Sequence, residues 1–340
     1  MIQEDSYILV MGASIVDILG FSRNTYKGMD SNPGNIKISL GGVCRNISEN
    51  LARVGVNTKF ISTIGDDENG RNILAHSAMI GYDMEESLIL EGGCTPTYMA
   101  ILDHTGEMVS AVVDMESLDE MDTDFIDSKK EVIKNSEYTI LDADNGELLE
   151  YILTKYAGKT KFVLDPVSAA KAEKIKHLIK YFHTIKPNRY EAEILCGFKI
   201  KTREDLDRAG EFFLSQGVEN IFISLDEDGI YYANKNESGQ IKAKNVKVKN
   251  TTGAGDSFVA GVGYGYMNNL AIKDTVKYAI AMSAITIYHE DTINPKMSEE
   301  YVEVYLDKIR VGRKYILEIK QSLHLIVFMA AILYYKKKVG

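Results

Sequence analysis

Cysteine is scarce in this sequence, whose 340 residues contain three: Cys44, Cys94 and Cys196. They are odd in number and far apart, and none belongs to a C-x-x-C pair, which argues against a disulfide framework and a structural zinc site. A reducing cytoplasm is the compartment that fits this usage. The first residues contain neither a basic region nor a long apolar stretch, so we expect no secretory signal peptide.

Positive charge is also in short supply. The 39 Lys and Arg residues stand against 49 Asp and Glu residues, which gives a formal net charge of −10. This balance argues against general nucleic-acid binding, because such proteins displace counterions with a cationic surface. It is compatible with a small anionic ligand, since a local nest of backbone amides can hold a phosphate. Apolar residues make up 45% of the chain, which is typical of a soluble globular protein.

One long apolar run lies near the end of the chain. Residues 323–335 are almost wholly apolar and precede three lysines. The run is shorter than the roughly 20 residues that a membrane-spanning helix needs, so we expect a packed helix or a partner contact instead. We therefore divide the chain into a main domain over 1–311 and a tail over 312–340. No internal repeat or low-complexity linker is found, so one domain with an appended β-lid is the simplest description.

Short apolar runs alternate with helical patterns along most of the chain. The first, at 7–11, stops at Gly12 and is typical of a buried strand. Further strands are expected at 59–64, 138–141, 162–165, 184–185 and 221–224, with helical patterns that include 47–54, 69–79, 256–266 and 272–287. This alternation predicts an α/β fold with a mostly parallel central sheet flanked by helices.

Two pairs of segments break the alternation. The runs at 97–102 and 108–113 flank a polar turn and predict a β-hairpin. A hairpin inside an α/β chain indicates a small antiparallel appendage. A second antiparallel pair is expected late in the chain, at 230–233 and 241–248.

The strongest functional signal is the run N-T-T-G-A-G-D-S-F over 250–258. Its small residues follow a strand-like stretch and open a helix, so backbone N–H groups and the positive end of the helix dipole can approach an anion closely. Asp256 would then lie beside a bound phosphate, where a base for a substrate hydroxyl is needed. The plainer interpretation is a glycine-rich turn with Asp256 as a helix-end charge, but the nine-residue context favours a site.

A second run, G-G-V-C-R-N over 41–46, is weaker on its own. Paired glycines at a helix start allow the backbone to approach a ligand closely. Asn46 can both donate to and accept from sugar hydroxyls. The same pattern is also typical of a tight turn followed by a helix cap.

Together these runs resemble the signatures of the ribokinase family of carbohydrate and nucleoside kinases, also called the phosphofructokinase-B type, over residues 6–310. Asp17, Asp165 and the N-x-x-E motif that ends at Glu191 fit the same family. The resemblance implies a three-layer ribokinase-like fold with a small β-sheet lid from about 18–40 and 95–115. It also implies an ATP- and Mg²⁺-dependent kinase of a primary sugar hydroxyl. Because the lid often pairs across a dimer in such proteins, a homodimer is expected.

The resemblance also assigns roles, residue by residue. Asp256 would be the catalytic base, with Gly253, Ala254 and Gly255 offering amides to the transferring phosphoryl group. The sugar would contact Asp17, Gly41, Gly42 and Asn46, and Lys171 would contact a base unless it is simply a solvated helix lysine. The nucleotide side would use Asn188, Ser224, Gly229 and Thr252. Glu191 would organise Mg²⁺ through water, and Asn250 stands where many family members hold K⁺, although Asp is common there.

Two positions depart from the family pattern. Cys44 stands where Gly, Ala or Pro is usual, and we expect it to reshape the sugar pocket. Asp226 stands where Gly usually follows a strand, and we expect it to alter the approach of the nucleotide. Neither replaces a group that the chemistry requires.

The acceptor is the least constrained part of the prediction. Runs at 30–34, 39–47, 165–168 and 292–295 resemble family members that phosphorylate pseudouridine, which implies transfer to its 5′-hydroxyl. Another nucleoside, ribose or fructose is the alternative acceptor. A non-catalytic ligand-binding regulator on the same fold is a further alternative, because fold alone does not define function. A Rossmann dehydrogenase is disfavoured, since the first strand is not followed by G-x-G-x-x-G.

Overall fold

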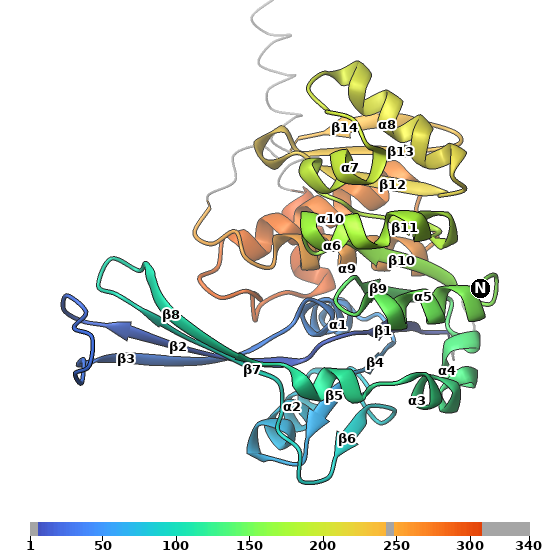
Figure 1. Ribbon diagram of the computed structural model, residues 1–340. Helices are drawn as coiled ribbons and strands as arrows, with labels where there is room; N and C mark the ends of the chain where they lie inside the picture. The colour runs from blue at the N-terminus through green and yellow to red at the C-terminus, as the bar shows by residue number, and fades with distance from the viewer. Residues whose placement is uncertain (1–5, 243–247, 308–340) are drawn as a thin grey trace, which may run out of the picture.

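The computed structural model describes residues 6–242 and 248–307, and Figure 1 shows their arrangement. The apolar run at 323–335 and the whole tail over 312–340 lie outside the described residues. Within the described part of the chain, no helix combines the length and the apolar character that crossing a membrane requires.

An eight-stranded sheet forms the centre of the molecule, in the order β14-β13-β12-β11-β10-β9-β1-β4. Its strands are parallel except for β13 and β14, which join the edge in antiparallel fashion. Their bounds are β1 Ile8–Met11, β4 Thr58–Ile61, β9 Tyr138–Asp142, β10 Lys161–Asp165, β11 Thr184–Ile185, β12 Asn220–Ser224, β13 Ile230–Asn234 and β14 Ser238–Ile241. Because parallel strands end at one edge, the loops that follow β1, β9, β10, β11 and β12 meet there.

Helices cover both faces of this sheet. Alternate residues of β1 point into two separate cores, Ile8 and Val10 into one and Leu9 and Met11 into the other. The first core is shared by α1 Val43–Arg53, α2 Glu68–Ile80, α9 Ala254–Met267 and α10 Ile272–Ile287. The second is shared by α3 Thr123–Ser128, α4 Lys130–Asn135, α5 Gly146–Lys155, α6 Ala169–Ile175, α7 Arg189–Cys196 and α8 Arg203–Ser215. The predicted three-layer α/β arrangement is confirmed.

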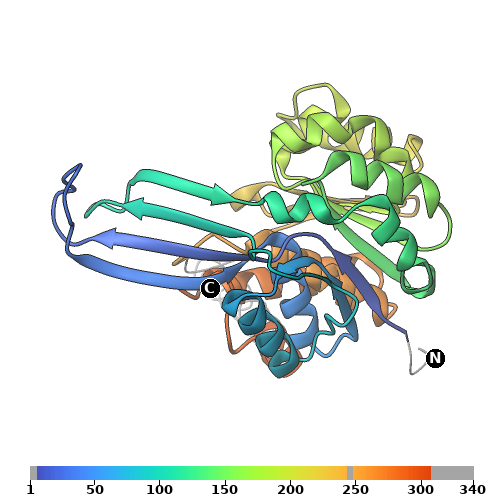
Figure 2. The ribbon, with the colours of Figure 1, turned by 60° about the horizontal axis from the view of Figure 1, so that its bottom comes forward.

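A second sheet, which we call the lid, projects from one side of the molecule (Figures 1 and 2). Its order is β3-β2-β7-β8, with β2 Ile15–Ser22, β3 Gly34–Gly41, β7 Thr97–Leu102 and β8 Met108–Asp114. The predicted hairpin is confirmed as β7 and β8. The lid exposes large apolar side chains, among them Ile36 at 74% and Val112 at 68%.

Two strand predictions were wrong in detail. The stretch 59–64 is not one strand: β4 ends at Ile61, and β5 Thr63–Gly65 pairs with β6 Leu88–Leu90 in a separate small sheet. The break falls at Ser62, whose backbone N–H donates to Ser87 Oγ and whose hydroxyl accepts from the Ser14 N–H. Late in the chain, the partner of β13 is β14 at 238–241 rather than 241–248, of which 243–247 lie outside the described residues. The Asn234 side chain tightens that hairpin by accepting from two backbone N–H groups.

Candidate active site

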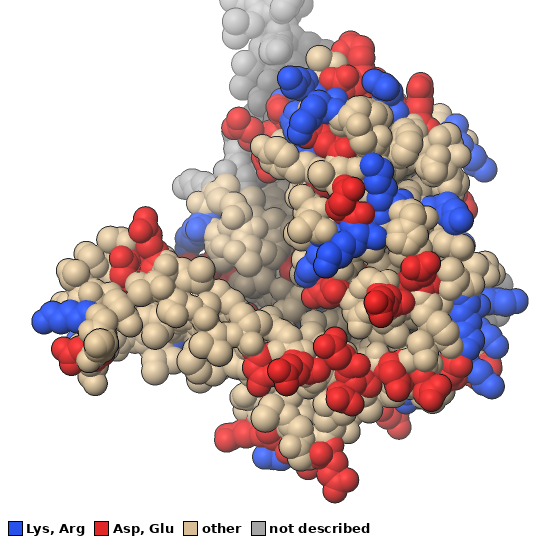
Figure 3. Space-filling model, in the orientation of Figure 1, with Lys and Arg blue, Asp and Glu red and all other residues tan. Residues whose placement is uncertain are grey.

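A cavity of about 840 Å³ lies between the base of the lid, the end of β1 and the start of α9. It brings together eight of the residues singled out from the sequence, Asp17, Gly41, Gly42, Asn46, Lys171, Thr252, Gly253 and Asp256. Its described lining holds five carboxylates, Asp17, Glu116, Asp119, Asp144 and Asp256, and a single cationic side chain, Lys171. Figure 3 shows that acidic side chains also gather outside, over the stretch that contains η1 Glu116–Glu120 and α3.

Asp256 lies in the first turn of α9, just after the residues that start the helix. Gly253 takes a left-handed φ of 80° as the N-cap, and a Cβ there would collide with the carbonyl oxygen of Thr292. The Asp256 carboxylate is buried and accepts a 2.7 Å hydrogen bond from Asn46 Nδ2. Burial and the negative charge of Asp165 raise the pKa of Asp256 to about 6, although Asn46, Lys186 and Arg45 oppose the rise. With a pKa of about 6, the side chain is mostly ionised at neutral pH.

The orientation of the Asn46 amide is fixed by its neighbour Arg45, a role that sequence reasoning missed. The Arg45 guanidinium donates to Asn46 Oδ1 and, at 3.2 Å, to the Gly41 carbonyl oxygen. Glu49 holds Arg45 in place at 2.6 Å and also bridges to Arg53 at 2.7 Å. Because Arg45 has only donors, the amide oxygen of Asn46 faces it and the amide nitrogen faces Asp256.

Lys186 is the second feature that sequence reasoning left without a role. It is buried at the end of β11, with its Nζ 3.0 Å from Asp165 Oδ2. A Cβ on Gly255 would lie 2.9 Å from the same Nζ, so the ammonium group sits directly behind the glycine-rich turn. Burial disfavours its charge, yet Asp165, Glu191 and Asp256 together raise the pKa of Lys186. The sequence did contain a signal for this residue, because Lys186 directly follows a parallel strand, at the sheet edge where sites form, and precedes Pro187.

Asp17 and the two glycines form the wall of the cavity next to the lid. Asp17 pairs with Ser39 across β2 and β3, and a Cβ on Gly41 would collide with its carboxylate. Gly42 has a φ of 99°, and a Cβ there would strike the carbonyl oxygen of Ala13. Position 42 therefore requires glycine, whereas a side chain at residue 41 would force the Asp17 carboxylate to move. Burial raises the pKa of Asp17, with the charge of Arg45 opposing it.

Of the residues predicted for the nucleotide, Thr252 lines this cavity, whereas Asn188, Ser224 and Gly229 do not. Asn188 and Glu191 form a reciprocal capping box on α7, with Glu191 Oε2 2.8 Å from the Asn188 N–H and Glu191 Oε1 2.9 Å from Asn188 Nδ2. Ser224 bridges to Asn188 at the end of β12. Gly229, with a φ of 84°, closes the tight turn into β13, and a Cβ there would collide with the carbonyl oxygen of Ile241.

Both departures from the family pattern have a structural explanation. Asp226 has a left-handed φ of 51°, the region that favours glycine and that Asp tolerates better than most residues. Cys44 is fully buried below the cavity, with its Sγ 3.2 Å from both the Met11 carbonyl oxygen and Asp142 Oδ2. It is not among the residues that line the cavity, so the expected reshaping of the pocket by a direct contact is not seen.

The donor set fits a magnesium ion that is held mainly by phosphate and water. No group of three or more His, Cys, Asp or Glu side chains that could hold a metal is found among residues 6–242 and 248–307. The Glu191 carboxylate is buried and already accepts from Asn188, while Asp165 is paired with Lys186. Since Mg²⁺ keeps several waters, an outer contact from Glu191 suffices. Asn250 donates to the Glu290 carbonyl oxygen and accepts from the Thr252 N–H, which fixes the loop before α9.

A helix-flanked parallel sheet, a projecting β-sheet lid and a buried aspartate behind a glycine-rich helix start define the ribokinase-like class of kinases. Residues 5–299 match the model of the pfkB family carbohydrate kinases, and the chain belongs to this family. It is an ATP-dependent kinase of a sugar or a nucleoside, as predicted.

Several relatives support this assignment. The chain is 34% identical over 298 residues to the pseudouridine kinase of Escherichia coli K12, which covers 87% of this chain and 95% of that protein. A crystal structure from Clostridium perfringens, named as a sugar kinase, is 58% identical with a TM-score of 0.87, over 90% of this chain and 97% of the other. A ribokinase II structure from Escherichia coli in complex with ATP and Mg²⁺ shares the fold, with 17% identity, a TM-score of 0.76 and coverage of 89% and 99%.

Proposed function

We propose that this protein transfers the γ-phosphoryl group of ATP to the 5′-hydroxyl of pseudouridine, with Asp256 as the base. The observation that carries the proposal is the buried Asp256 carboxylate, held 2.7 Å from Asn46 at the start of α9 in a cavity that Asp17 also lines. A pure binding protein has no need of an ionised carboxylate with a raised pKa at that point.

The proposed step uses groups of this chain throughout. The 5′-oxygen forms a bond to the γ-phosphorus, the bond from that phosphorus to the β,γ-bridging oxygen breaks, ADP leaves, and the hydroxyl proton moves to Asp256. The N–H groups of Gly253, Ala254 and Gly255, with Lys186 behind them, stabilise the charge on the transferring group. When bound, Mg²⁺ neutralises phosphate charge, with Glu191 and Asn188 as its outer contacts. Asp17, Gly42 and Asn46 hold the ribose.

The charge of the cavity favours a neutral acceptor. Five carboxylates line it against one lysine, so a sugar that already carries a phosphate would be repelled at the acceptor side. A nucleoside or free sugar meets no such penalty. The relative named as a pseudouridine kinase, together with the runs at 30–34 and 165–168, supports pseudouridine over ribose, fructose or another nucleoside.

A coupled ADP-release assay with Mg-ATP tests this proposal. The acceptors are pseudouridine, uridine, adenosine, inosine, ribose and fructose, each with a control lacking acceptor. Preferred turnover of pseudouridine is the expected result. If ribose or fructose is turned over preferentially, pseudouridine is the wrong acceptor and that sugar takes its place in the proposal. If no acceptor is used while nucleotide or nucleoside still binds, the protein is a regulator and the proposed reaction is wrong.

The pKa of Asp256 predicts a pH dependence. A base works only when ionised, so kcat/KM should rise with pH through a midpoint at about 6 and then level off. The Asn46 amide lowers this pKa by donating to the carboxylate, so Asn46→Ala should move the midpoint to higher pH. The measurement is kcat/KM for the preferred acceptor between about pH 5 and 8. A midpoint that stays fixed in Asn46→Ala would show that another group controls the profile.

Two further expectations belong to the same proposal. A K⁺ ion near Asn250 and Thr252 would support the anion site, and replacing K⁺ by Na⁺ in the assay tests it. A homodimer through the lid is supported by the exposed apolar side chains of β3 and β8, such as Ile38 at 65% and Met108 at 62%. Sedimentation of the purified protein decides that point.

A further inference from the structure

Three polar side chains that have no part in phosphoryl transfer line the same cavity, and they come from the loop after β9 and from α6. They are Asp144, Asn145 and Lys171. Lys171 Nζ forms an ion pair with Asp144 Oδ1. The two side chains keep 34% and 37% of their surface exposed, so the pair is open to the cavity rather than sealed inside the protein.

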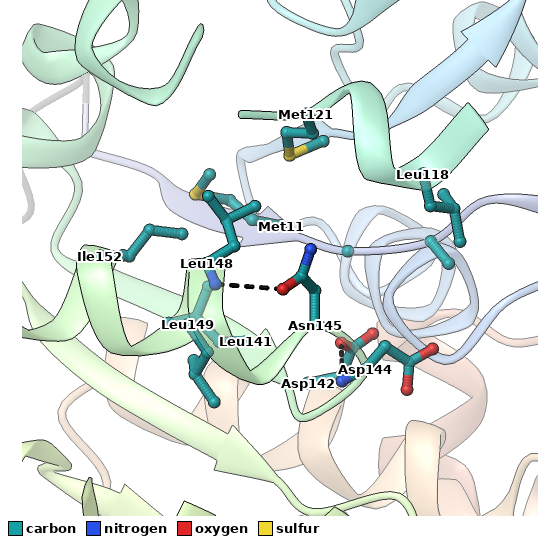
Figure 4. Close-up of a pocket in the computed structure, with 12 residues that line it drawn as sticks. Met11, Leu118, Met121, Leu141, Asp142, Asp144, Asn145, Leu148, Leu149 and Ile152 are labelled. Atoms are coloured by element: carbon teal, nitrogen blue, oxygen red, sulfur yellow. Dashed lines mark hydrogen bonds between the residues drawn. The ribbon is translucent and has the colours of Figure 1, made fainter. Parts of the chain in front are cut away.

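The loop that carries Asp144 and Asn145 is held in place from both sides. The Asp144 N–H donates to Asp142 Oδ1 at 3.1 Å. Asn145 caps α5 by accepting from the Leu148 N–H at 3.1 Å, and its amide nitrogen points away from that helix (Figure 4). A small cavity of about 70 Å³ lies behind the loop, lined mainly by apolar side chains such as Met121 and Leu149. Asp144 and Asn145 are therefore held on a fixed loop, which has the active-site cavity on one side and a small, mainly apolar cavity on the other.

The turn that places Lys171 is strained. Val167 has a φ of 65°, a conformation that is costly for a β-branched residue. Hydrogen bonds from the Val167 N–H to Asp165 Oδ1 at 3.0 Å and from the Ser168 N–H to the Pro166 carbonyl oxygen at 2.7 Å hold the turn. Ser168 then caps α6 through the Lys171 N–H. Strain that the surrounding structure maintains is typical of ligand sites.

We propose that the Asp144–Lys171 pair reads the edge of a uracil ring that is joined to ribose through carbon. This inference rests on the proposed function. The carboxylate accepts from the ring N1–H and the ammonium group donates to the neighbouring C2 carbonyl. The Asp144 acceptor lies beside the Lys171 donor, and this arrangement matches the adjacent N–H and C=O groups of the ring edge.

The geometry discriminates against the nitrogen-linked isomer. When uridine is superposed through its sugar and glycosidic bond, its C5–H falls where pseudouridine has N1–H, whereas its C4 carbonyl falls where pseudouridine has C2=O. Lys171 therefore keeps a partner in uridine, but Asp144 faces a C–H group. A site that hydrogen-bonds a ligand N–H group strongly rejects an analogue that lacks this group, because the acceptor of the site is left without a donor. Asp144 is thus the residue that distinguishes the two isomers, and Lys171 serves both.

The test compares pseudouridine and uridine with three variants. Asp144→Ala should lower kcat/KM for pseudouridine by roughly 10- to 100-fold while leaving that for uridine nearly unchanged. Lys171→Met should lower both. Asp144→Asn keeps an acceptor oxygen and should retain most of the preference. Asp207→Ala is the control. Asp207 forms an ion pair with Arg203 on α8, and its side chain is 43% exposed, close to the 37% of Asp144, so the variant also breaks a part-exposed ion pair but lies outside the cavity lining.

Calorimetric binding of each nucleoside without ATP gives a second readout that does not depend on turnover. The two isomers should bind Asp144→Ala with similar Kd and the wild type with different Kd. If the wild type uses pseudouridine but Asp144→Ala keeps the full preference, the base-reading role is wrong and the proposed function stands. If the wild type uses ribose and binds neither nucleoside, the proposed acceptor is wrong and the base-reading role is overturned with it.

Discussion

Replacing Asp256 by Asn is expected to lower kcat by about 10³-fold, since a positioned general base contributes on the order of 10²- to 10⁴-fold. The amide is almost isosteric with the carboxylate but has no capacity to take the hydroxyl proton. Its burial costs less than burial of the charge, because desolvation already raises the pKa of Asp256 to about 6. The fold should therefore survive the change.

Steady-state kinetics and ATP binding, measured on the same preparation, separate these effects. Binding of Mg-ATP should stay close to that of the wild type, because Asp256 contacts Asn46 rather than residues of the nucleotide side. Asp165→Asn is not a suitable control, since it would leave the buried Lys186 without its partner. Wild-type turnover in Asp256→Asn would mean that the base has been assigned to the wrong residue.

Replacing Gly253 by Ala is expected to lower kcat by roughly 10²-fold, because the change displaces the amides around the phosphoryl group. Gly253 has a left-handed φ of 80°, and its new Cβ would collide with the carbonyl oxygen of Thr292. The backbone of the turn has to move, and Ala254, Gly255 and Asp256 move with it.

Gly158→Ala is the matched control. Gly158 also has a left-handed φ, of 70°, but a Cβ there meets nothing within 4 Å. Gly158→Ala should lose about 1 kcal/mol of folding free energy from backbone strain alone, whereas Gly253→Ala should lose more because of the collision with Thr292 and should be the only one of the two to lose turnover. Urea unfolding and kcat measured on both decide the matter. Equal turnover in the two variants would show that the turn does not stabilise the reacting phosphate.

Much of the fold could be predicted because its parallel strands are buried on both faces. Short apolar runs such as 7–11 and 138–141 are visible without any structure. The strands β2 and β3 of the lid were harder to find in the sequence. They flank a polar, glycine-bearing stretch, and apolar residues of β3 such as Ile36 are exposed, so burial does not mark this strand. The break between β4 and β5 was not predictable, because it depends on Ser87, which is distant in sequence from Ser62.

The same distinction applies to the site. Asp256 and Gly253 could be found because one continuous run carries both the small residues and the acid. Nothing in the linear sequence shows that Arg45 turns the Asn46 amide toward Asp256, or that Lys186 lies behind Gly255. Those relations join residues of α1 and α9 with a lysine that directly follows β11, so only the folded chain reveals them.

A crystal structure with pseudouridine, Mg²⁺ and a non-hydrolysable ATP analogue is the most direct test of Asp256 as the base. The 5′-oxygen should lie about 2.6 to 3.2 Å from the Asp256 carboxylate, with the γ-phosphate facing the N–H groups of residues 253–255. A 5′-hydroxyl that points away from Asp256, or a γ-phosphate bound elsewhere, would contradict the proposed reaction.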